Sequence, residues 1–219
     1  RRITDLPEAG DDSAPAWSRA ELTKRQIAAG MTLEDVEMIL APMIEDGKEA
    51  IGSMGDDTPL AVISDKPRLI SQFFRQNFSQ VTNPPIDSLR ERHVMSLKTR
   101  FSNLANILEE KSQNADVLVL DSPVLTAHDW RKLKSAFGPL GAEIDCTFDI
   151  SAGQEGLRAA ITRIREEAVA AVRMGKSELF LTDDNISEDR VGIAMILAAA
   201  AVHTHLVRNG LRSYSSINV

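Results

Sequence analysis

The second half of the chain alternates between strand-like and helix-like patterns of apolar residues. Residues 117–120 form an unbroken apolar run, which is typical of a strand buried on both faces. Strands are also predicted at 144–150, where apolar and polar residues alternate, at 178–182 and at 212–219. Long helices are predicted at 154–174 and 189–209. This order predicts an α/β fold of parallel βαβ units, with fewer strands than the eight of a closed (β/α)₈ barrel.

The first half of the chain has the pattern of helices separated by turns. A helix over residues 19–28 is expected to end at Gly30. Thr32 and Asp35 form a capping box for a second helix, which we expect Pro42 to end after residue 40. We predict that residues 1–18, rich in Pro, Gly and Asp, are a linker or arm, and that residues 19–219 are the domain.

A third helix is predicted to start at Asp65, which suits an N-cap, and to end before Pro84. Its apolar residues recur every three or four positions and form one face: Leu69, Ile70, Phe73, Phe74, Phe78 and Val81. Further along we expect a short helix after Asp87, a strand at 94–97, a loop over 98–113 and a helix over 126–137.

Composition and charge exclude several classes of protein. A hydrophobic content of 43% and a charged content of 26% are typical of a globular domain. The net charge of −7 argues against a nucleic-acid partner, which needs concentrated Lys and Arg. The longest apolar run, residues 192–202, is too short to span a bilayer, so we predict no membrane association. The single cysteine, Cys146, fits a reducing cytoplasm and excludes an iron–sulfur cluster held by this chain alone.

Candidate catalytic and ligand-binding motifs have simple structural interpretations. Gly153 and Gly156 open a helix after a strand, where amides can bind phosphate, but Glu155 between them favours an ordinary turn. Asp183 and Asp184 follow a predicted strand, at the edge where parallel-sheet enzymes place catalytic groups. We interpret them as part of the start of the helix predicted at residue 189.

The histidines and the cysteine give no recognisable motif. His203 and His205 are two residues apart on a predicted helix, so they point to nearly opposite faces and cannot bind one metal ion together. We expect one at the edge of the core and the other in solvent. Cys146 shares a strand face with Ile144 and Phe148 and is predicted to be buried and unreactive.

The stretch from residue 51 to residue 87 has the strongest signal for function. Glycines bracket a serine and a methionine, and two aspartates, a threonine and a proline follow. A large apolar side chain in such a polar turn is favourable when it packs against another surface, which makes Met54 the leading candidate contact. The candidate interdomain residues are Ser53, Met54, Gly55, Asp56, Asp57, Thr58, Asn83, Pro84 and Pro85.

Three runs in this chain resemble the central domain of the glutamate synthase large subunit. They are LAPM at 40–43, DGKEAIGSMGDDTPLAVISDKPRL at 46–69 and QVTNPPID at 80–87. The later run LTDDNISEDRVGIAMILAAAAVHTHLVRNGLR, at 181–212, is similar to the distal βαβ portion of the same domain. The resemblance extends from about residue 25 to the C-terminus.

The resemblance implies a non-catalytic connecting domain with no cofactor of its own. In this family an amidotransferase domain hydrolyses glutamine, and ammonia passes to an FMN-binding domain with an iron–sulfur cluster, where 2-oxoglutarate becomes glutamate. The central domain resembles a degenerate flavin barrel that joins those two domains and lines part of the ammonia route. The resemblance places the 53–58 loop against the flavin domain and residues 83–87 at a second interdomain edge.

Two other hypotheses remain open from the sequence. One is an independent α/β barrel enzyme that binds a flavin or a phosphorylated ligand through Asp183, Asp184 and the Gly153 turn. The other is a scaffold module that binds a partner through residues 51–87 and conducts nothing. The chain starts at Arg1 rather than Met and stops before the central domain is expected to end, which suggests a piece of a longer protein. The sequence does not select between a pyridine nucleotide and ferredoxin as electron donor.

Overall fold

A computed structural model of the chain describes residues 5–6, 17–50, 61–66, 68–74, 85–112 and 117–219. The chain divides into two units. The C-terminal unit comprises residues 1–14, 99–120 and 125–219, and the N-terminal unit comprises residues 15–98 and 121–124. Each unit is described by itself.

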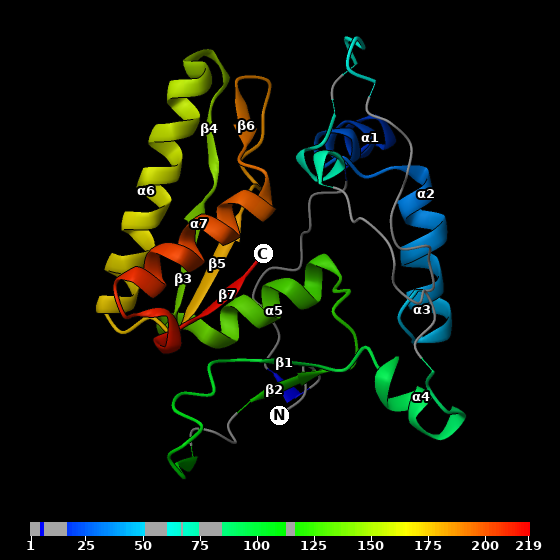
Figure 1. Ribbon diagram of the computed structural model, residues 1–219, viewed down its shortest axis with the longest axis vertical. Coiled ribbons are helices and arrows are strands. Elements are labelled where there is room, and N and C mark those ends of the chain that lie inside the picture. Colours follow the sequence, from blue (N-terminus) through cyan, green and yellow to red (C-terminus); the bar gives the residue numbers. More distant parts are fainter. Residues whose placement is uncertain (1–4, 7–16, 51–60, 67, 75–84, 113–116) are drawn as a thin grey trace. The chain divides into compact units, whose positions relative to one another are not determined.

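A three-stranded parallel sheet is the centre of the C-terminal unit (Figure 1). Its strands are β3 (Gly141–Asp145), β5 (Glu178–Thr182) and β7 (Ser216–Asn218), in the order β3-β5-β7. Ile144 pairs with Leu181, and Leu179 pairs with Ile217. β5, the middle strand, is buried along almost its whole length, as its continuous apolar sequence predicts.

Two long helices cover one face of this sheet. α6 (Gly153–Arg173) and α7 (Met195–Arg208) pack against each other and against the sheet. Alternate residues of β5 point to this side, so Leu179 and Leu181 join the same core as Ile164 and Val202. The structure confirms the helix predicted at 154–174 and the strand predicted at 178–182, and it confirms the second long helix over residues 195–208 of the predicted 189–209.

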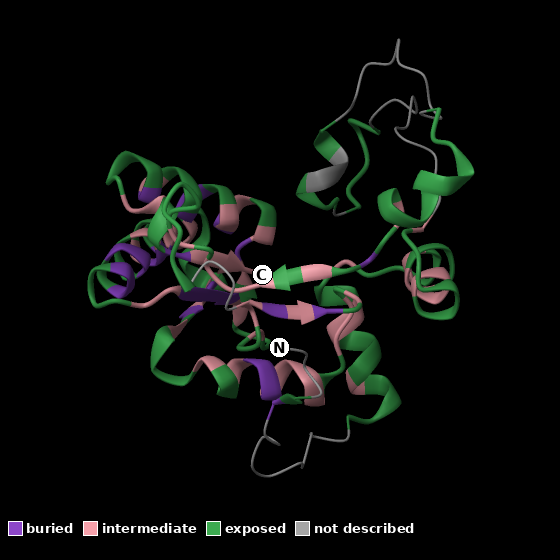
Figure 2. Cartoon of the chain, turned by 90° about the horizontal axis from the view of Figure 1, so that it is seen from below, coloured by how far each residue is buried: buried purple, intermediate pink, exposed green. Residues whose placement is uncertain are grey.

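The other face of the sheet is covered by α5 (Ala127–Phe137) and by a small antiparallel pair, β1 (Thr99–Phe101) and β2 (Leu118–Leu120). Phe180 points to this side, and its ring centroid lies 5.4 Å from that of Trp130 in an edge-on contact. Leu6 is buried in the same cluster. Figure 2 shows the buried residues of this unit concentrated on the sheet and on the inward sides of its helices.

A second antiparallel pair, β4 (Thr147–Asp149) and β6 (Arg190–Gly192), leaves the carboxyl edge of the parallel sheet (Figure 1). Two predictions are wrong here. Residues 144–150 are not one strand, because the chain changes partner at Cys146 and enters a different sheet. The helix does not start at residue 189, because residues 190–192 pair with β4 and the helix begins at Met195.

The fold is therefore a mixed α/β structure with a parallel sheet, and the described residues form no closed barrel. The strand predicted at 117–120 exists, but it pairs antiparallel with β1 instead of joining the parallel sheet. The last strand is shorter than predicted, because a 3₁₀ turn, η7 (Arg212–Tyr214), precedes β7. Two further 3₁₀ turns, η5 (Gly138–Leu140) and η6 (Ile150–Ala152), flank β3 and β4.

The N-terminal unit begins with α1 (Arg19–Ala28), capped by Ser18 and followed by Gly30 at φ 70°, as predicted. Thr32 and Asp35 form the predicted capping box of α2 (Leu33–Asp35). The chain then stays helical, through a π-helical stretch, η2 (Val36–Leu40), and α3 (Ala41–Asp46). Pro42 does not end the helix, because the change from π to α bonding places it in the first turn of α3, where its missing N–H is tolerated.

The remaining elements of the N-terminal unit are short. Asp87 caps α4 (Ser88–Val94), which confirms the helix predicted there. The predicted strand at 94–97 is wrong, since Val94 ends α4 and the strand β1 begins at Thr99, inside the predicted loop. Of the helix predicted after Asp65, the described residues contain only a 3₁₀ turn, η3 (Ile70–Phe73), and residues 75–84 lie outside the described part of the chain.

Candidate functional site

The carboxyl edge of the parallel sheet is the place where α/β proteins usually bind ligands. β3 ends at Asp145 and β5 ends at Thr182, and these two residues pair across the sheet. The backbone N of Cys146 donates to the carbonyl of Thr182 (2.8 Å), and the N of Ile193 donates to the carbonyl of Cys146 (2.8 Å). Cys146, which makes both of these bonds, therefore connects the parallel sheet to the antiparallel pair of β4 and β6.

Thr147 is the centre of a polar network at this edge, and its side chain is fully buried. Its hydroxyl donates to Asp145 Oδ1 (2.7 Å) and accepts from Arg190 Nε (3.0 Å) and Nη2 (2.6 Å). Arg190 Nη2 also lies 3.2 Å from Asp145 Oδ2. A hydroxyl, a carboxylate and a guanidinium therefore bond to one another where β3 becomes β4.

A second arginine bonds the backbone of the same segment. Arg163, on α6, donates from Nη2 to the carbonyls of Asp145 (2.8 Å) and Thr147 (3.0 Å). Its Nη1 lies 3.1 Å from Glu167, one helical turn further on. Arg163 thus links α6 by hydrogen bonds to the segment where β3 becomes β4. Its positive charge is paired with Glu167 on the same helix.

The network sets the ionisation of its acidic groups. Burial raises the pKa of Asp145, but hydrogen bonds from Thr147 and Asn185 and the charge of Arg190 outweigh burial and hold this pKa below its ordinary value. Burial raises the pKa of the Cys146 thiol to about 11, although the nearby charge of Arg163 opposes the shift. The thiol stays protonated at neutral pH, which confirms the prediction of a buried cysteine and supports that of an unreactive one.

The glycines that open α6 serve close packing. A Cβ on Gly156 would lie 2.5 Å from the Cβ of Ala152 and 3.3 Å from Phe148 Cδ2, so only glycine fits. Gly153 has φ 53°, a conformation that favours glycine. Asp149 accepts from the N (2.8 Å) and hydroxyl (2.6 Å) of Ser151 just before the helix. These contacts support the interpretation of the motif as a strand-to-helix turn.

Asp183 and Asp184 lie in a turn, and the prediction that they belong to a helix start is wrong. The carbonyl of Asp183 accepts from the N of Ile186 (3.0 Å), and the N of Asp184 donates to Thr182 Oγ1 (3.1 Å). The next helix begins more than ten residues later because β6 comes between.

The histidines are placed as predicted, with His203 exposed and His205 half-buried. His203 Nδ1 accepts a hydrogen bond from Arg212 Nε (2.9 Å). Within the described ranges, no group of three or more His, Cys, Asp or Glu residues could hold a metal ion. In the same part of the chain, no helix has the length and apolar character needed to cross a membrane.

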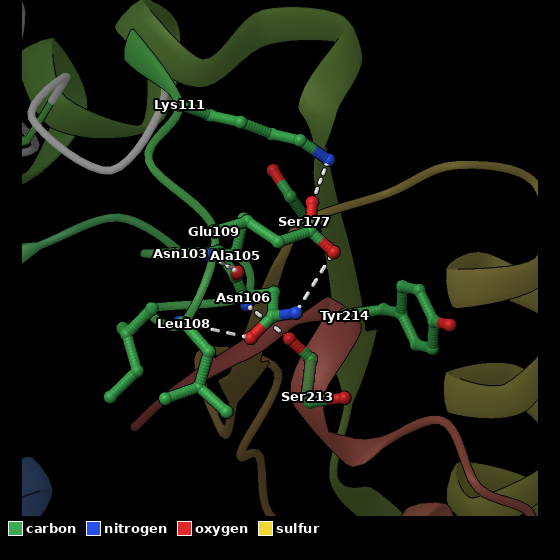
Figure 3. Close-up of a pocket in the computed structure, with 10 residues that line it drawn as sticks. Asn103, Ala105, Asn106, Leu108, Glu109, Lys111, Ser177, Ser213 and Tyr214 are labelled. Atoms are coloured by element: carbon green, nitrogen blue, oxygen red, sulfur yellow. Dashed lines mark hydrogen bonds and ion pairs between the residues drawn. The ribbon is translucent and has the colours of Figure 1, made fainter.

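A hollow of about 740 Å³ lies at the opposite, amino edge of the sheet, between the 103–111 loop and the turns that precede β5 and β7 (Figure 3). Behind it, the fully buried carboxylate of Glu178 accepts from the N of Asn103 (3.0 Å) and from Asn218 Nδ2 (3.2 Å). Burial raises the pKa of Glu178, and these two hydrogen bonds oppose the shift. Sequence reasoning missed this group, because a glutamate at a strand start has no pattern that distinguishes a buried side chain from an exposed one.

Comparison with known proteins gives a family for this fold. The family model of the glutamate synthase central domain matches residues 24–219. The chain belongs to the glutamate synthase central domain family.

Relatives of this central domain are large proteins. The chain is 58% identical to the "Glutamate synthase [NADPH] large chain" of Azospirillum brasilense, over 92% of this chain and 13% of the relative. It is 45% identical to "Glutamate synthase [NADH]" of Schizosaccharomyces pombe, over 96% of this chain and 10% of the relative. It is also 45% identical to "Ferredoxin-dependent glutamate synthase 2, chloroplastic" of Arabidopsis thaliana, over 90% of this chain and 12% of the relative. The chain thus spans about a tenth of the length of these relatives.

Most of the predicted interdomain residues of this central domain lie outside the described residues. These are Ser53, Met54, Gly55, Asp56, Asp57, Thr58, Asn83 and Pro84. Pro85 is described and exposed, two residues before the Asp87 cap of α4. The contact predicted for these residues stays a prediction. What the structure brings together instead is the Asp145–Thr147–Arg190 network, in which Arg190 was missed because its partners are 43 and 45 residues away.

Proposed function

We propose that this chain is a non-catalytic connecting domain of a longer glutamate synthase. The proposal is carried by the carboxyl edge of the sheet, where Asp145, Thr147 and Arg190 bond to one another instead of forming an open ligand site. The family match over residues 24–219 supports it further, as does the small share of each relative that the chain spans.

In this proposal the chemistry belongs to other domains of the same polypeptide. The parent enzyme would convert glutamine, 2-oxoglutarate and a reductant into glutamate, with FMN and an iron–sulfur cluster held outside this chain. The amidotransferase and FMN-binding domains are then the partners of this domain. The single cysteine of the chain fits a reducing compartment such as the cytoplasm.

We also propose that the loop around Met54 lines part of the ammonia route. Ammonia must be kept from bulk water, where it is protonated and lost, so an apolar side chain in a Gly- and Pro-constrained loop suits a wall of such a conduit. The loop composition is the basis of this step: Ser53, Met54, Gly55, Asp56, Asp57, Thr58, with Asn83, Pro84 and Pro85 at a second edge.

The experiment compares Met54→Asp with Met174→Asp in a full-length glutamate synthase that contains this domain. Met174 is a suitable control because it follows α6 and is 73% exposed. Met54→Asp is expected to lower glutamine-dependent glutamate synthesis by about tenfold or more, the effect of roughly 1.4 kcal/mol on a barrier, with glutaminase activity nearly unchanged. Met174→Asp should change neither rate.

Two results would contradict the ammonia route. One is an equal loss of both activities in Met54→Asp, which would indicate a damaged fold. The other is no loss of either activity. Activity with added ammonium chloride separates transfer from reduction, since a blocked route leaves the ammonia-dependent reaction intact.

We further infer that the sheet is related to a degenerate flavin-binding barrel. The order β3-β5-β7 advances in one direction, and α6 and α7 both lie on one face of the sheet, as successive units of a (β/α)₈ barrel do. Titration of the purified chain with FMN is expected to give no binding and no flavin absorbance. A chain that is purified yellow, or that is stabilised by FMN, would instead favour an independent flavin enzyme.

A further inference from the structure

Glu178 is a buried carboxyl group that the proposed function does not use. It is the first residue of β5, and its side chain is fully buried. Because side chains alternate along a strand, Glu178 shares the face of Phe180, opposite the helices α6 and α7. Glutamate is almost never fully buried unless it is paired with a cation. The partners of this carboxylate therefore decide what it can do.

Two neutral donors hold the carboxylate of Glu178. Its Oε1 accepts from the backbone N of Asn103 (3.0 Å), and its Oε2 accepts from Asn218 Nδ2 (3.2 Å). An ionised carboxylate has about four lone-pair positions, so these bonds use only part of its capacity. Neither donor carries a full charge, and neither can neutralise a buried anion.

The charged side chains on the surrounding segments do not neutralise Glu178 either. Lys111 pairs with Glu109, and Lys176 donates to the carbonyl of Pro139 (2.6 Å). Burial raises the pKa of Glu178 against its two hydrogen bonds, and no charged group of the described residues is a further cause of the shift. The charged residues on these segments are Arg100 on β1, Glu109, Glu110 and Lys111 on the loop, Lys132 on α5, Lys176 before β5 and Arg212 in η7.

The 103–111 loop separates Glu178 from the hollow of about 740 Å³ (Figure 3). Asn103 lines this hollow and bonds Glu178 from its backbone, and its Nδ2 donates to the carbonyl of Ser213 (3.3 Å). A shift of Asn103 would break both bonds and admit water to the carboxyl group. Such a shift buries or exposes little apolar surface, because Ile107 and Leu108 are already 74% and 89% exposed.

We propose that Glu178 is a pH-sensitive switch for the 103–111 loop, which is closed while the carboxyl group is neutral and opens as the group ionises. Closed means that Asn103 bonds Glu178 as in this structure, and open means that water replaces Asn103. A neutral carboxyl group keeps acceptor capacity on its oxygens, so its two donors stay bonded. Ionisation leaves a full charge in the core with neutral donors alone, which is far more costly. The switch uses residues of this chain alone and does not depend on the proposed connecting role.

The direction of the pH dependence follows from the two states of the loop. In the closed loop, burial raises the pKa of Glu178 above its ordinary value of 4.5, and hydration in the open loop removes this cause. An acid whose pKa is raised in the closed state stabilises that state below the open-state pKa. This contribution is lost as the pH rises through the closed-state pKa. The loop should therefore be most protected at the acidic end of the range.

The test is amide hydrogen exchange in a full-length glutamate synthase that contains this domain. Exchange of peptides that cover residues 103–108 is measured by mass spectrometry from about pH 5 to pH 8 in the unsubstituted enzyme, in Glu178→Gln and in Glu143→Gln. Glutamine keeps the size of glutamate and an acceptor oxygen for Asn103, but it does not titrate. Glu143 is a matched control, because it is an exposed glutamate of β3 that pairs with Lys134 (3.2 Å). The loop sequence is the same in all three proteins, so intrinsic exchange cancels in their ratios.

The exchange rate of the unsubstituted enzyme, divided by that of Glu178→Gln, is expected to rise by about tenfold from pH 5 to pH 8. The same ratio with Glu143→Gln should stay constant. A constant ratio with Glu178→Gln, or an equal trend with Glu143→Gln, would overturn the proposal.

Asn218→Ala tests the switch without replacing Glu178. It removes one of the two donors, so an ionised Glu178 is held less well than a neutral one. Loop exchange in this variant should exceed that of the unsubstituted enzyme more at pH 8 than at pH 5. An equal excess at both pH values would show that the loop responds to the lost bond and not to ionisation, and the proposal would be wrong.

Discussion

Replacement of Thr147 by Val tests whether the Asp145–Thr147–Arg190 network stabilises the carboxyl edge of the sheet. Valine keeps the size and β-branching of threonine, so packing is preserved and the hydroxyl alone is removed. That hydroxyl is fully buried and makes three hydrogen bonds, of 2.6, 2.7 and 3.0 Å, to Asp145 and Arg190. The variant therefore isolates the free energy of the network from the free energy of the core.

The expected loss can be worked out from the partners that remain. Hydrogen bonds to charged groups contribute about 1.5–3 kcal/mol each. Arg190 Nη2 retains the carbonyl of Thr147 at 3.3 Å and Asp145 Oδ2 at 3.2 Å, and the Arg190 side chain is 42% exposed, so water replaces part of what is lost. We expect the free energy of unfolding to fall by about 2–4 kcal/mol, the value of one to two such bonds. Thr147→Ser keeps the hydroxyl and should lose only about 1 kcal/mol, for one buried methyl group.

The assay is urea unfolding followed by tryptophan fluorescence. In a Trp17→Phe background the signal comes from Trp130, whose ring contacts Phe180 at 5.4 Å and thus reports on the C-terminal unit. The midpoints of the unsubstituted protein, Thr147→Val and Thr147→Ser are converted to free energies with a common slope. If Thr147→Val loses no more stability than Thr147→Ser, the network does not stabilise this edge and the reasoning is refuted.

The same variant has a pH signature. In the wild type, burial acts to raise the pKa of Asp145, but the bonds from Thr147 and the charge of Arg190 hold it below the ordinary value of 3.8. A carboxylate with a lowered folded pKa stabilises the fold above its unfolded pKa, and that contribution is lost as the pH falls through the folded pKa. The difference between wild type and Thr147→Val should thus be largest above about pH 4 and should shrink at lower pH.

Two further substitutions test the packing and the buried charge. Gly156→Ala should destabilise the C-terminal unit by about 1–3 kcal/mol in the same urea assay, because the new Cβ would lie 2.5 Å from that of Ala152. The double change Ala152→Gly with Gly156→Ala should recover most of the loss, whereas stabilisation by Gly156→Ala alone would show that helix propensity outweighs the contact. For Glu178, burial raises the folded pKa, so its contribution to stability is present below the unfolded pKa and is lost as the pH rises through the folded pKa. Glu178→Gln removes this titration, and unfolding free energies measured from about pH 4 to pH 8 should show less decline than the wild type, while equal slopes would contradict the assignment.

The sequence by itself determined the elements whose signals are local. The helix α5 was predicted with its cap at Thr126 and its end at Gly138, because capping bonds and glycine stops involve residues a few positions apart. The strand β5 was predicted from its continuous apolar run, and the helix α6 was predicted from its amphipathic pattern. Both patterns indicate directly which residues are buried. The long family resemblance, supported by the match to residues 24–219, carried the functional hypothesis.

Only the tertiary structure decided where the chain changes partners. An alternating run from Ile144 to Ile150 is equally compatible with one strand or two, and the break at Cys146 depends on bonds to Thr182 and Ile193, 36 and 47 residues away. Residues 189–194 were assigned to a helix, but pairing with β4 makes 190–192 a strand. Backbone hydrogen bonds between distant segments outweigh local propensity once both are brought to one edge, and the pattern along a chain carries no record of which segments meet. The buried Glu178 and the 103–111 loop that bonds it arise in the same way, from partners that only the fold places side by side.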